Sequence, residues 1–284
     1  MDVKKNQFDF ITTTILGLLQ GEKVPWVFPY EERCCQASSF QTKKEYSLFN
    51  KLLILAQTGR NGGEYVGEKF IQKNSYTLKD GAKSISIIFS MPPHYQIDKN
   101  DEKKWYGGFS KSLPVYNIND VMGLSEDYKP SENKRFKNAD DVVKCYLKKT
   151  NISIVHSNET PKFVPDRDEV TIPCKDKFKT ETDYYKVLFH ELIHSTQKKE
   201  RCNRMSAVFT KDKDEYAAEE LVAEIGSAYL SSLCGLPNYL GTIQNTAEYC
   251  RGWYEKLNQV PALFMRASKE AEKAVKYITV DCAN

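Results

Sequence analysis

Two histidines and a glutamate lie close together in the C-terminal half of the chain, in the stretch FHELIHSTQ (189–197). The surrounding segment, 184–199, has no glycine or proline and has apolar residues at helical spacing, which predicts a helix. On that helix His190 and His194 lie one turn apart on the same face, where two imidazoles can bind one metal ion. Glu191 projects roughly 100° round the helix, close enough to act on a metal-bound water without being a ligand.

This arrangement is typical of hydrolytic zinc sites, in which the ion lowers the pKa of its water to ~7 and a carboxylate takes the proton. The alternative is a surface helix with two histidines. The chain has four histidines, and two of them lie in this motif. We therefore favour a metal site and expect Zn2+, although another divalent metal ion also suits these ligands.

A catalytic zinc ion needs a third protein ligand and one open coordination position. The next predicted helix, DEYAAEELVAEIGSAYL (214–230), places Glu220 and Glu224 one turn apart on a face otherwise rich in alanine and leucine. A carboxylate is costly to bury there unless it is paired or binds a cation. We expect Glu220 to be the third ligand and Glu224 to orient a ligating histidine. Glu219 competes with Glu220 for the ligand position, and a solvated helix face is the alternative for these acids.

Two further features could serve a peptidase. The segment DEVTIPC (168–174) is predicted as an extended edge strand just before the metal helix, and such an edge can hold a substrate backbone by strand addition. A hairpin in the core is an equal alternative. Tyr216 could stabilise an oxyanion, but a place in the core is the favoured interpretation for this aromatic residue.

The elements that must position these residues follow from apolar periodicity and from breaks at glycine and proline. With 284 residues, 40% of them hydrophobic, the chain is long enough for a sizeable core, and we expect two domains. The patterns predict helices at 5–20, 46–57, 139–149, 180–199, 212–234, 246–259 and 262–279, strands at 84–89, 113–118 and 152–155, and a hairpin at 162–173. The stretch between strands 84–89 and 113–118 is expected to be irregular.

The predicted fold class is α+β. A small mixed α/β N-terminal domain is expected over 1–125 and a mostly helical domain with a modest sheet over 139–284. Between them, 126–138 is charged, contains proline and is almost free of aliphatic residues, as in a linker.

Composition excludes several classes of protein. The net charge of +3 is too small to imply nucleic-acid or membrane binding by itself. The N-terminus lacks the features of a secretory signal, and no later run approaches the ~20 apolar residues of a membrane span. A soluble, cytoplasmic protein is expected. The eight cysteines form no C-x-x-C pair and are expected to be reduced and mostly buried.

The chain resembles the ArdC-type antirestriction proteins of mobile genetic elements such as plasmids. The resemblance rests on YYKVLFHELIHST, RCNR and EYAAEELVAEIGSAYL, and less strongly on YSLFNKLLILAQ, LKDGAK and PVYNINDV. It implies an N-terminal domain that binds single-stranded DNA and a C-terminal zincin-like metallopeptidase domain. It also implies that His190, His194 and Glu220 bind the metal and that Glu191 is the general base.

The N-terminal half has a modest physical signal for binding a DNA strand. Between 41 and 84 there are eight basic and four acidic residues, with aromatic residues among them. A basic groove with stacking aromatics is what single-strand binding requires. The candidate DNA-binding residues are Lys43, Lys44, Tyr46, Asn50, Arg60, Tyr65, Tyr76, Lys79 and Lys83. The alternatives are core packing for the aromatics and solvation for the lysines.

These observations favour a single-stranded-DNA-binding antirestriction protein with a zinc-dependent peptidase domain of the HExxH-plus-glutamate type. The first alternative is a DNA-protecting protein without proteolytic activity, whose metal site is structural. The second is a metallopeptidase whose N-terminal domain recognises protein.

Overall fold

The computed structural model describes residues 3–28, 36–60, 62–91, 94–97, 103–124, 138–204, 213–236, 246–260 and 262–282. The helices are α1 (Val3–Gln20), α2 (Leu48–Thr58), α3 (Glu68–Lys73), α4 (Ala139–Thr150), α5 (Glu181–Ser195), α6 (Lys213–Leu233), α7 (Thr246–Gln259) and α8 (Ala262–Thr279). The strands are β1 (Gln36–Ser39), β2 (Gly62–Gly67), β3 (Thr77–Leu78), β4 (Ile85–Met91), β5 (His94–Ile97), β6 (Lys103–Tyr106), β7 (Phe109–Asn117), β8 (Val121–Met122), β9 (Ser153–His156), β10 (Lys162–Val164) and β11 (Glu169–Ile172). The predicted α+β class is confirmed, and every predicted helix is present.

A four-stranded sheet forms the centre of the N-terminal half, in the order β1-β2-β7-β4. Helix α2 lies along the outer edge of β4, and its side chains form hydrogen bonds with the backbone of that strand. The Asn50 amide donates to the Ile88 carbonyl and accepts from the Ile88 N–H, both at 2.9 Å. Gln57 makes the same pair of bonds to Ser86, again at 2.9 Å. Two side-chain amides on one helix thus take the place of a neighbouring strand.

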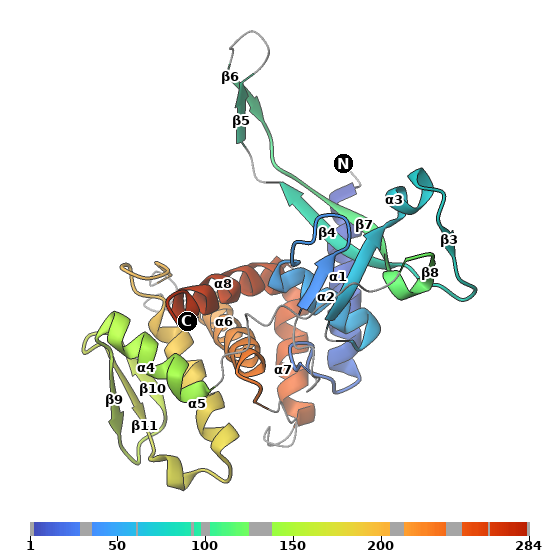
Figure 1. Cartoon of the computed structure of the whole chain (residues 1–284). Coiled ribbons are helices and arrows are strands. Elements are labelled where there is room, and N and C mark those ends of the chain that lie inside the picture. Colours follow the sequence, from blue (N-terminus) through green and yellow to red (C-terminus); the bar gives the residue numbers. More distant parts are fainter. Residues whose placement is uncertain are drawn as a thin grey trace.

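The stretch expected to be irregular contains β5 and β6, which pair antiparallel. They project away from the body of the molecule beyond β4 and β7 (Figure 1). The prediction is wrong here because it relied on composition: the stretch is rich in lysine, aspartate and asparagine, which are depleted in strands. The hairpin continues the antiparallel pairing of β4 with β7. A sequence pattern does not show such pairing between distant segments.

The C-terminal half has a three-stranded sheet in the order β10-β11-β9. Strand β11 pairs antiparallel with β10 and parallel with β9. The expectation of an edge strand at 168–174 is therefore wrong, because β11 is the central strand and β9 occupies its second side. The edge of this sheet next to α5 is β10 instead.

One hydrophobic core contains residues from both halves of the chain. Trp26 is 1% exposed, and its ring lies 5.8 Å from that of Trp253 on α7 and 6.2 Å from that of Phe264 on α8. The backbone N–H of Leu48, at the start of α2, donates to Glu272 on α8 at 3.1 Å. Helix α8 thus lies between the two sheets (Figure 1). The linker predicted over 126–138 lies outside the described residues except for its last position, and the domain division stays a prediction.

The cysteines differ from expectation. Cys145 on α4 and Cys282, just after α8, form a disulfide with a Cα–Cα distance of 5.8 Å. Cys174 is exposed and Cys250 is buried. The expectation of reduced, mostly buried thiols is wrong for the bonded pair, and of the four described free cysteines only Cys250 is buried, because spacing along the chain shows neither pairing nor burial. Within the described part of the chain, no helix is long and apolar enough to cross a membrane.

Candidate metal centre

Helix α5 holds the HExxH motif in a fixed orientation. Thr180 caps its N-terminus, where the hydroxyl accepts from the Asp183 N–H at 3.1 Å. Its apolar face is buried, with Leu188, Phe189, Leu192 and Ile193 at most 1% exposed. The two histidines lie on the remaining side of the helix, where they approach Glu220 of α6.

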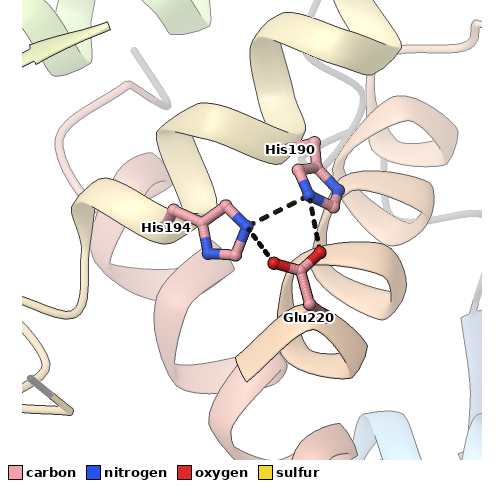
Figure 2. Close-up of side chains that lie close together, drawn as sticks. All are labelled: His190, His194 and Glu220. Carbon is pink, nitrogen blue, oxygen red and sulfur yellow. Dashed lines mark hydrogen bonds and ion pairs between the residues drawn. The ribbon is translucent and has the colours of Figure 1, made fainter. Parts of the chain in front are cut away.

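The structure brings His190, His194 and Glu220 together (Figure 2). The Nε2 atoms of the two histidines are 3.0 Å apart. The carboxylate of Glu220 lies 3.6 Å from each of them, with one oxygen toward each ring. Ligands bound at ~2.1 Å in a tetrahedral arrangement are roughly 3.4 Å apart, as geometry requires. The three side chains are thus spaced to hold one metal ion with little rearrangement.

The charged groups of this cluster shift one another's pKa values. Burial alone would raise the pKa of Glu220, but the hydrogen bond to His190 and the charges of both histidines lower it to about 2. Burial would lower the pKa of His190, whereas Glu220 and the nearby Glu224 and Glu191 carboxylates raise it. The site thus stabilises positive charge, as a cation-binding site does.

Glu219, the competitor for the ligand position, contacts His194 from the other side of the ring. One of its oxygens lies 3.4 Å from His194 Nδ1. Both oxygens also accept from Arg204, at 3.0 Å each. Burial opposes its charge, but His194 and Arg204 hold the pKa of Glu219 below its usual value. This geometry orients His194 for a metal on its Nε2 side.

The sequence predicts that Glu224 orients a ligating histidine, but in the structure the carboxylate that contacts a histidine from behind is that of Glu219. Glu224 influences His190 only through its charge, and no hydrogen bond joins the two side chains among the described residues. It lies instead beside Tyr249 on α7, whose pKa is raised by burial and by the Glu224 carboxylate. Residues 219 and 224 are five positions apart and therefore point to different sides of α6, but spacing alone does not show which side faces His194.

Glu191 lies next to the three candidate ligands and is 8% exposed. Burial raises its pKa, although the two histidines and a backbone hydrogen bond at Phe163 oppose the rise. Phe163 belongs to β10, so the outer edge of that strand faces Glu191. A buried carboxylate beside the three candidate ligands is placed to accept and return a proton.

These residues line a cavity of about 370 Å³ between α5, α6 and β10. Tyr216 lines it too and is 56% exposed. The expectation that Tyr216 belongs to the core is wrong, because it lies one turn before Glu220 and its hydroxyl hydrogen-bonds to that carboxylate. Sequence reasoning did not single out Gln197, which also lines the cavity and is 2% exposed; its Oε1 has no hydrogen-bond partner in the described part of the chain.

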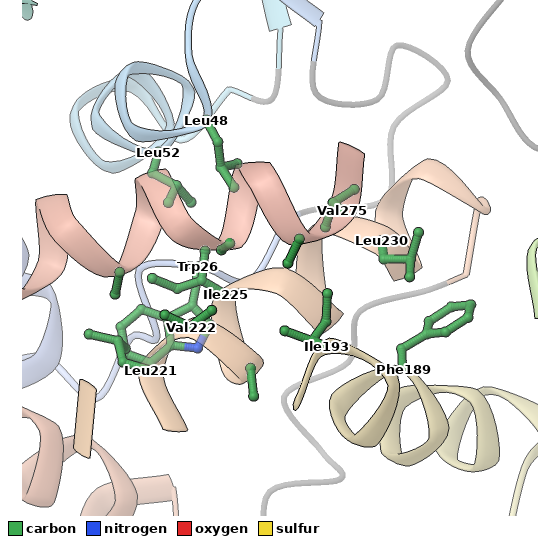
Figure 3. Packing of buried hydrophobic residues seen from close by; sticks show 14 of the residues in the cluster. Trp26, Leu48, Leu52, Phe189, Ile193, Leu221, Val222, Ile225, Leu230 and Val275 are labelled. Atoms are coloured by element: carbon green, nitrogen blue, oxygen red, sulfur yellow. The ribbon is translucent and has the colours of Figure 1, made fainter. Parts of the chain in front are cut away.

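The close approach of α5 and α6 sets the spacing of the ligands. A Cβ atom at Gly226 would lie 2.9, 3.1 and 3.2 Å from three side-chain atoms of Ile193. Ile193 is fully buried and points from α5 toward α6 (Figure 3). Glycine at this position therefore lets α6 pack against the helix that bears both histidines.

Two of the candidate DNA-binding residues are buried. Tyr65 is 1% exposed inside a small core, and Asn50 is 8% exposed and bonded to β4. Burial argues against direct contact of either side chain with DNA. Tyr46 and Tyr76 are half-buried, and Tyr76 stacks on Phe70 at 6.2 Å.

The five basic candidates are exposed on three connections: Lys43 and Lys44 between β1 and α2, Arg60 between α2 and β2, and Lys79 and Lys83 between β3 and β4. Lys43 is already paired with Glu64 at 2.8 Å. No candidate aromatic is fully exposed beside them.

Sequence reasoning missed an exposed aromatic pair. Phe89 on β4 is 40% exposed and Phe109 on β7 is 44% exposed, and their rings lie 5.9 Å apart. The Lys111 ammonium lies 5.8 and 5.9 Å from the two rings. The alternation of Phe109 and Lys111 indicates a shared face, but only the strand register, which pairs Phe89 with Lys111, joins the three.

Two family models match the chain over successive segments. Residues 5–138 match the N-terminal domain of anti-restriction factor ArdC, and residues 141–270 match a zincin-like metallopeptidase. Together they cover nearly the whole sequence. The second segment contains the HExxH motif and Glu220.

Among curated relatives, two proteins named DNA primase TraC from Escherichia coli are 25% and 24% identical over 98% of this chain. The chain spans 20% and 27% of their lengths, so it corresponds to one part of much longer proteins. Two crystal structures of the antirestriction ArdC protein from plasmid R388 have the same fold. The metal-free structure aligns with a TM-score of 0.74 over 100% of this chain and 99% of that one, and the Mn(II)-bound structure with 0.71 over 98% of each, both at 22% identity.

Proposed function

We infer function from the family to which this chain belongs, the ArdC family, in which an ArdC N-terminal domain is followed by a zincin-like metallopeptidase domain. We propose that the protein is a cytoplasmic antirestriction protein of a mobile genetic element that binds single-stranded DNA and hydrolyses peptide bonds. The observation that carries the peptidase part is the cluster of His190, His194 and Glu220 beside Glu191 in one cavity.

A divalent metal ion is proposed at the three ligands, with zinc as the preferred ion. Two imidazoles and a carboxylate in tetrahedral spacing suit Zn2+ and leave one position for water or substrate. The Mn(II) ion in the R388 ArdC structure supports a divalent ion and leaves Mn2+ as the alternative. When bound, the ion supplies a Lewis acid that polarises the peptide carbonyl and acidifies water.

The protein's own groups then account for proton transfer. Glu191 accepts a proton from the attacking water and returns it to the leaving amine, a role that its raised pKa favours. The Tyr216 hydroxyl, which hydrogen-bonds to Glu220 in this structure, would turn from that carboxylate to donate to the carbonyl oxygen as negative charge develops there. Glu219 keeps His194 in the orientation in which Nε2 faces the ion.

The substrate backbone is proposed to lie along β10. This strand is an edge of its sheet within the described chain, and it lines the cavity through Lys162 and Phe163. An extended peptide could add to that edge and place its carbonyl above the three ligands.

Single-stranded DNA is proposed to bind the N-terminal half. The support is the exposed set of Lys43, Lys44, Arg60, Lys79 and Lys83 together with the Phe89–Phe109 pair. Exposed rings beside a lysine can stack on bases while cations contact phosphates. Replacing Phe109 by alanine is expected to cost ~1–3 kcal/mol of affinity for a fluorescent oligonucleotide. Met122→Ala, at another exposed apolar residue of this half, is the matched control and should change nothing. Equal affinities of the two variants would exclude Phe109 from the DNA surface.

The peptidase proposal is tested with Glu191→Gln. The variant should bind metal as the unaltered protein does and lose at least ~100-fold of its activity on an unfolded protein substrate, because the general base is gone. Full activity with metal bound would remove Glu191 from the mechanism. Transfer of an unmodified plasmid into a restricting host then separates two functions. If Glu191→Gln protects the plasmid fully, DNA binding alone provides antirestriction, and the metal only braces the fold.

A further inference from the structure

A second cavity lies behind the metal centre, on the other side of Glu219. It has a volume of about 300 Å³ and is lined by Cys202, Arg204, Glu219, Arg266, Glu270 and Lys273, among others. Glu219 lines both cavities. The proposed peptidase mechanism makes no use of this second space.

Arg204 is the central feature of the cavity because its guanidinium is buried but only partly satisfied. The residue is 8% exposed. Its Nε and Nη2 atoms donate to Glu219, and Nη2 also donates to the Ile193 carbonyl at 3.2 Å and the Thr196 hydroxyl at 3.0 Å. The remaining nitrogen, Nη1, has no hydrogen-bond partner among the described residues. Two buried N–H donors without an acceptor are costly, and because Arg204 lines the cavity, an acceptor is expected there.

The charges around the cavity favour an anion as that acceptor. Glu219 is already matched by Arg204, and Glu270 is matched by Lys273 at 2.6 Å. Arg266 forms no ion pair within the described part of the chain and remains as the unmatched cation. Three cations and two carboxylates leave one positive charge on the lining. A volume of about 300 Å³ also far exceeds the ~30 Å³ share of a single water molecule.

We propose that this cavity is a binding site for a small oxyanion, a phosphate or a carboxylate, held by Arg204 Nη1 and Arg266. A guanidinium is suited to both because its N–H groups match the spacing of paired oxygens. The anion lies one side chain away from the metal centre, since Arg204 contacts Glu219 and Glu219 contacts His194. The site is separate from the peptide-binding cavity and uses residues from the 196–204 turn and from α8.

The test uses the full-length chain, dialysed against a chelator so that the anion has no metal ion to bind. Calorimetric titrations with inorganic phosphate and with acetate, at constant ionic strength in chloride, measure the two sources of the oxyanion separately. Arg266→Ala should weaken binding at least tenfold, because it removes the unmatched charge. Lys269→Ala is the matched control, an exposed cation on the same helix that does not line the cavity, and should change affinity less than twofold.

Cys202 gives a second readout that reports the location of the anion. It is half-buried in the cavity, whereas Cys174 is exposed elsewhere. At ten times its Kd the anion should slow alkylation of Cys202 by N-ethylmaleimide about tenfold, since only about one site in eleven is then free. Alkylation of Cys174, followed by mass spectrometry in the same sample, should not change.

Binding of either anion with this pattern supports the site and identifies its preferred ligand. The proposal is overturned if neither phosphate nor acetate binds more tightly than chloride. It is equally overturned if Arg266→Ala and Lys269→Ala weaken binding alike, or if Cys202 is not protected. Circular dichroism on both variants excludes unfolding as the cause of a loss.

Discussion

Replacement of Gly226 by alanine tests whether the close packing of α6 on α5 sets the metal site. The new Cβ would lie 2.9 Å from the Ile193 Cδ1 atom and 3.1 and 3.2 Å from two further carbons of that side chain. Carbon atoms pack best at ~3.5–4.0 Å, so a shift of roughly half an ångström is needed. Ile193 is fully buried and β-branched, so it cannot easily rotate away.

Two opposing effects determine the size of the change. Overpacking costs ~1–3 kcal/mol, whereas alanine in a helix interior is favoured over glycine by ~1 kcal/mol. Gly226→Ala should therefore lose up to ~2 kcal/mol of unfolding free energy. Gly252→Ala is the matched control, in the interior of α7 with no atom within 4 Å of the added Cβ, and should gain ~0.5–1 kcal/mol.

Urea unfolding of the metal-free proteins measures both changes. Competition with a coloured chelator then measures metal affinity, which should fall for Gly226→Ala because bound ligands tolerate displacements of only ~0.2 Å. It should be unchanged for Gly252→Ala. The reasoning is refuted if Gly226→Ala is as stable as Gly252→Ala and binds metal equally well.

Two other predictions concern the carboxylates of α6. Glu219→Gln should weaken metal binding ~10–100-fold by removing the partner of His194, whereas Glu224→Gln should weaken it less than ~3-fold. Competition with a chelator measures both affinities. If Glu224→Gln had the larger effect, the role first expected for Glu224 would be restored. In the metal-free protein, the lowered pKa of Glu220 stabilises the fold above its ordinary value of 4.5, and the raised pKa of His190 stabilises it below 6.5, with loss as the pH rises further. Glu220→Gln should therefore lower the melting temperature most between pH 4.5 and 6.5 and least at pH 8.5, and an equal loss at all pH values would contradict the charge pairing.

Sequence patterns locate the longer helices because apolar residues recur along them at helical spacing, whereas the six-residue α3, with one buried residue, is missed. The HExxH spacing is enough to place His190 and His194 on one side of α5, because residues four apart lie on the same face of a helix. Helix spacing does not identify the third candidate ligand in the same way. Glu219 and Glu220 are neighbours, and Arg204 holds Glu219 on the Nδ1 side of His194, whereas Glu220 lies on the Nε2 side. That contact comes from a turn before α6 whose path cannot be derived from spacing.

The remaining differences arise from pairing between segments distant in sequence. β11 is a central strand because β9 pairs with its second side. Asn50 is buried because α2 lies along the edge of β4, where its amide replaces a strand. Tyr216 is exposed because the first turns of α6 border a cavity rather than the core. None of these features is encoded in the local period of the sequence.

The most direct test of the metal centre is anomalous diffraction at the zinc absorption edge from crystals of the full-length protein loaded with Zn2+. A single peak is predicted at ~2.0–2.2 Å from His190 Nε2, His194 Nε2 and a Glu220 oxygen, with Glu219 on the far side of His194 and outside the coordination sphere. A peak bound by Glu219 in place of Glu220, or none between the two histidines, would contradict the site.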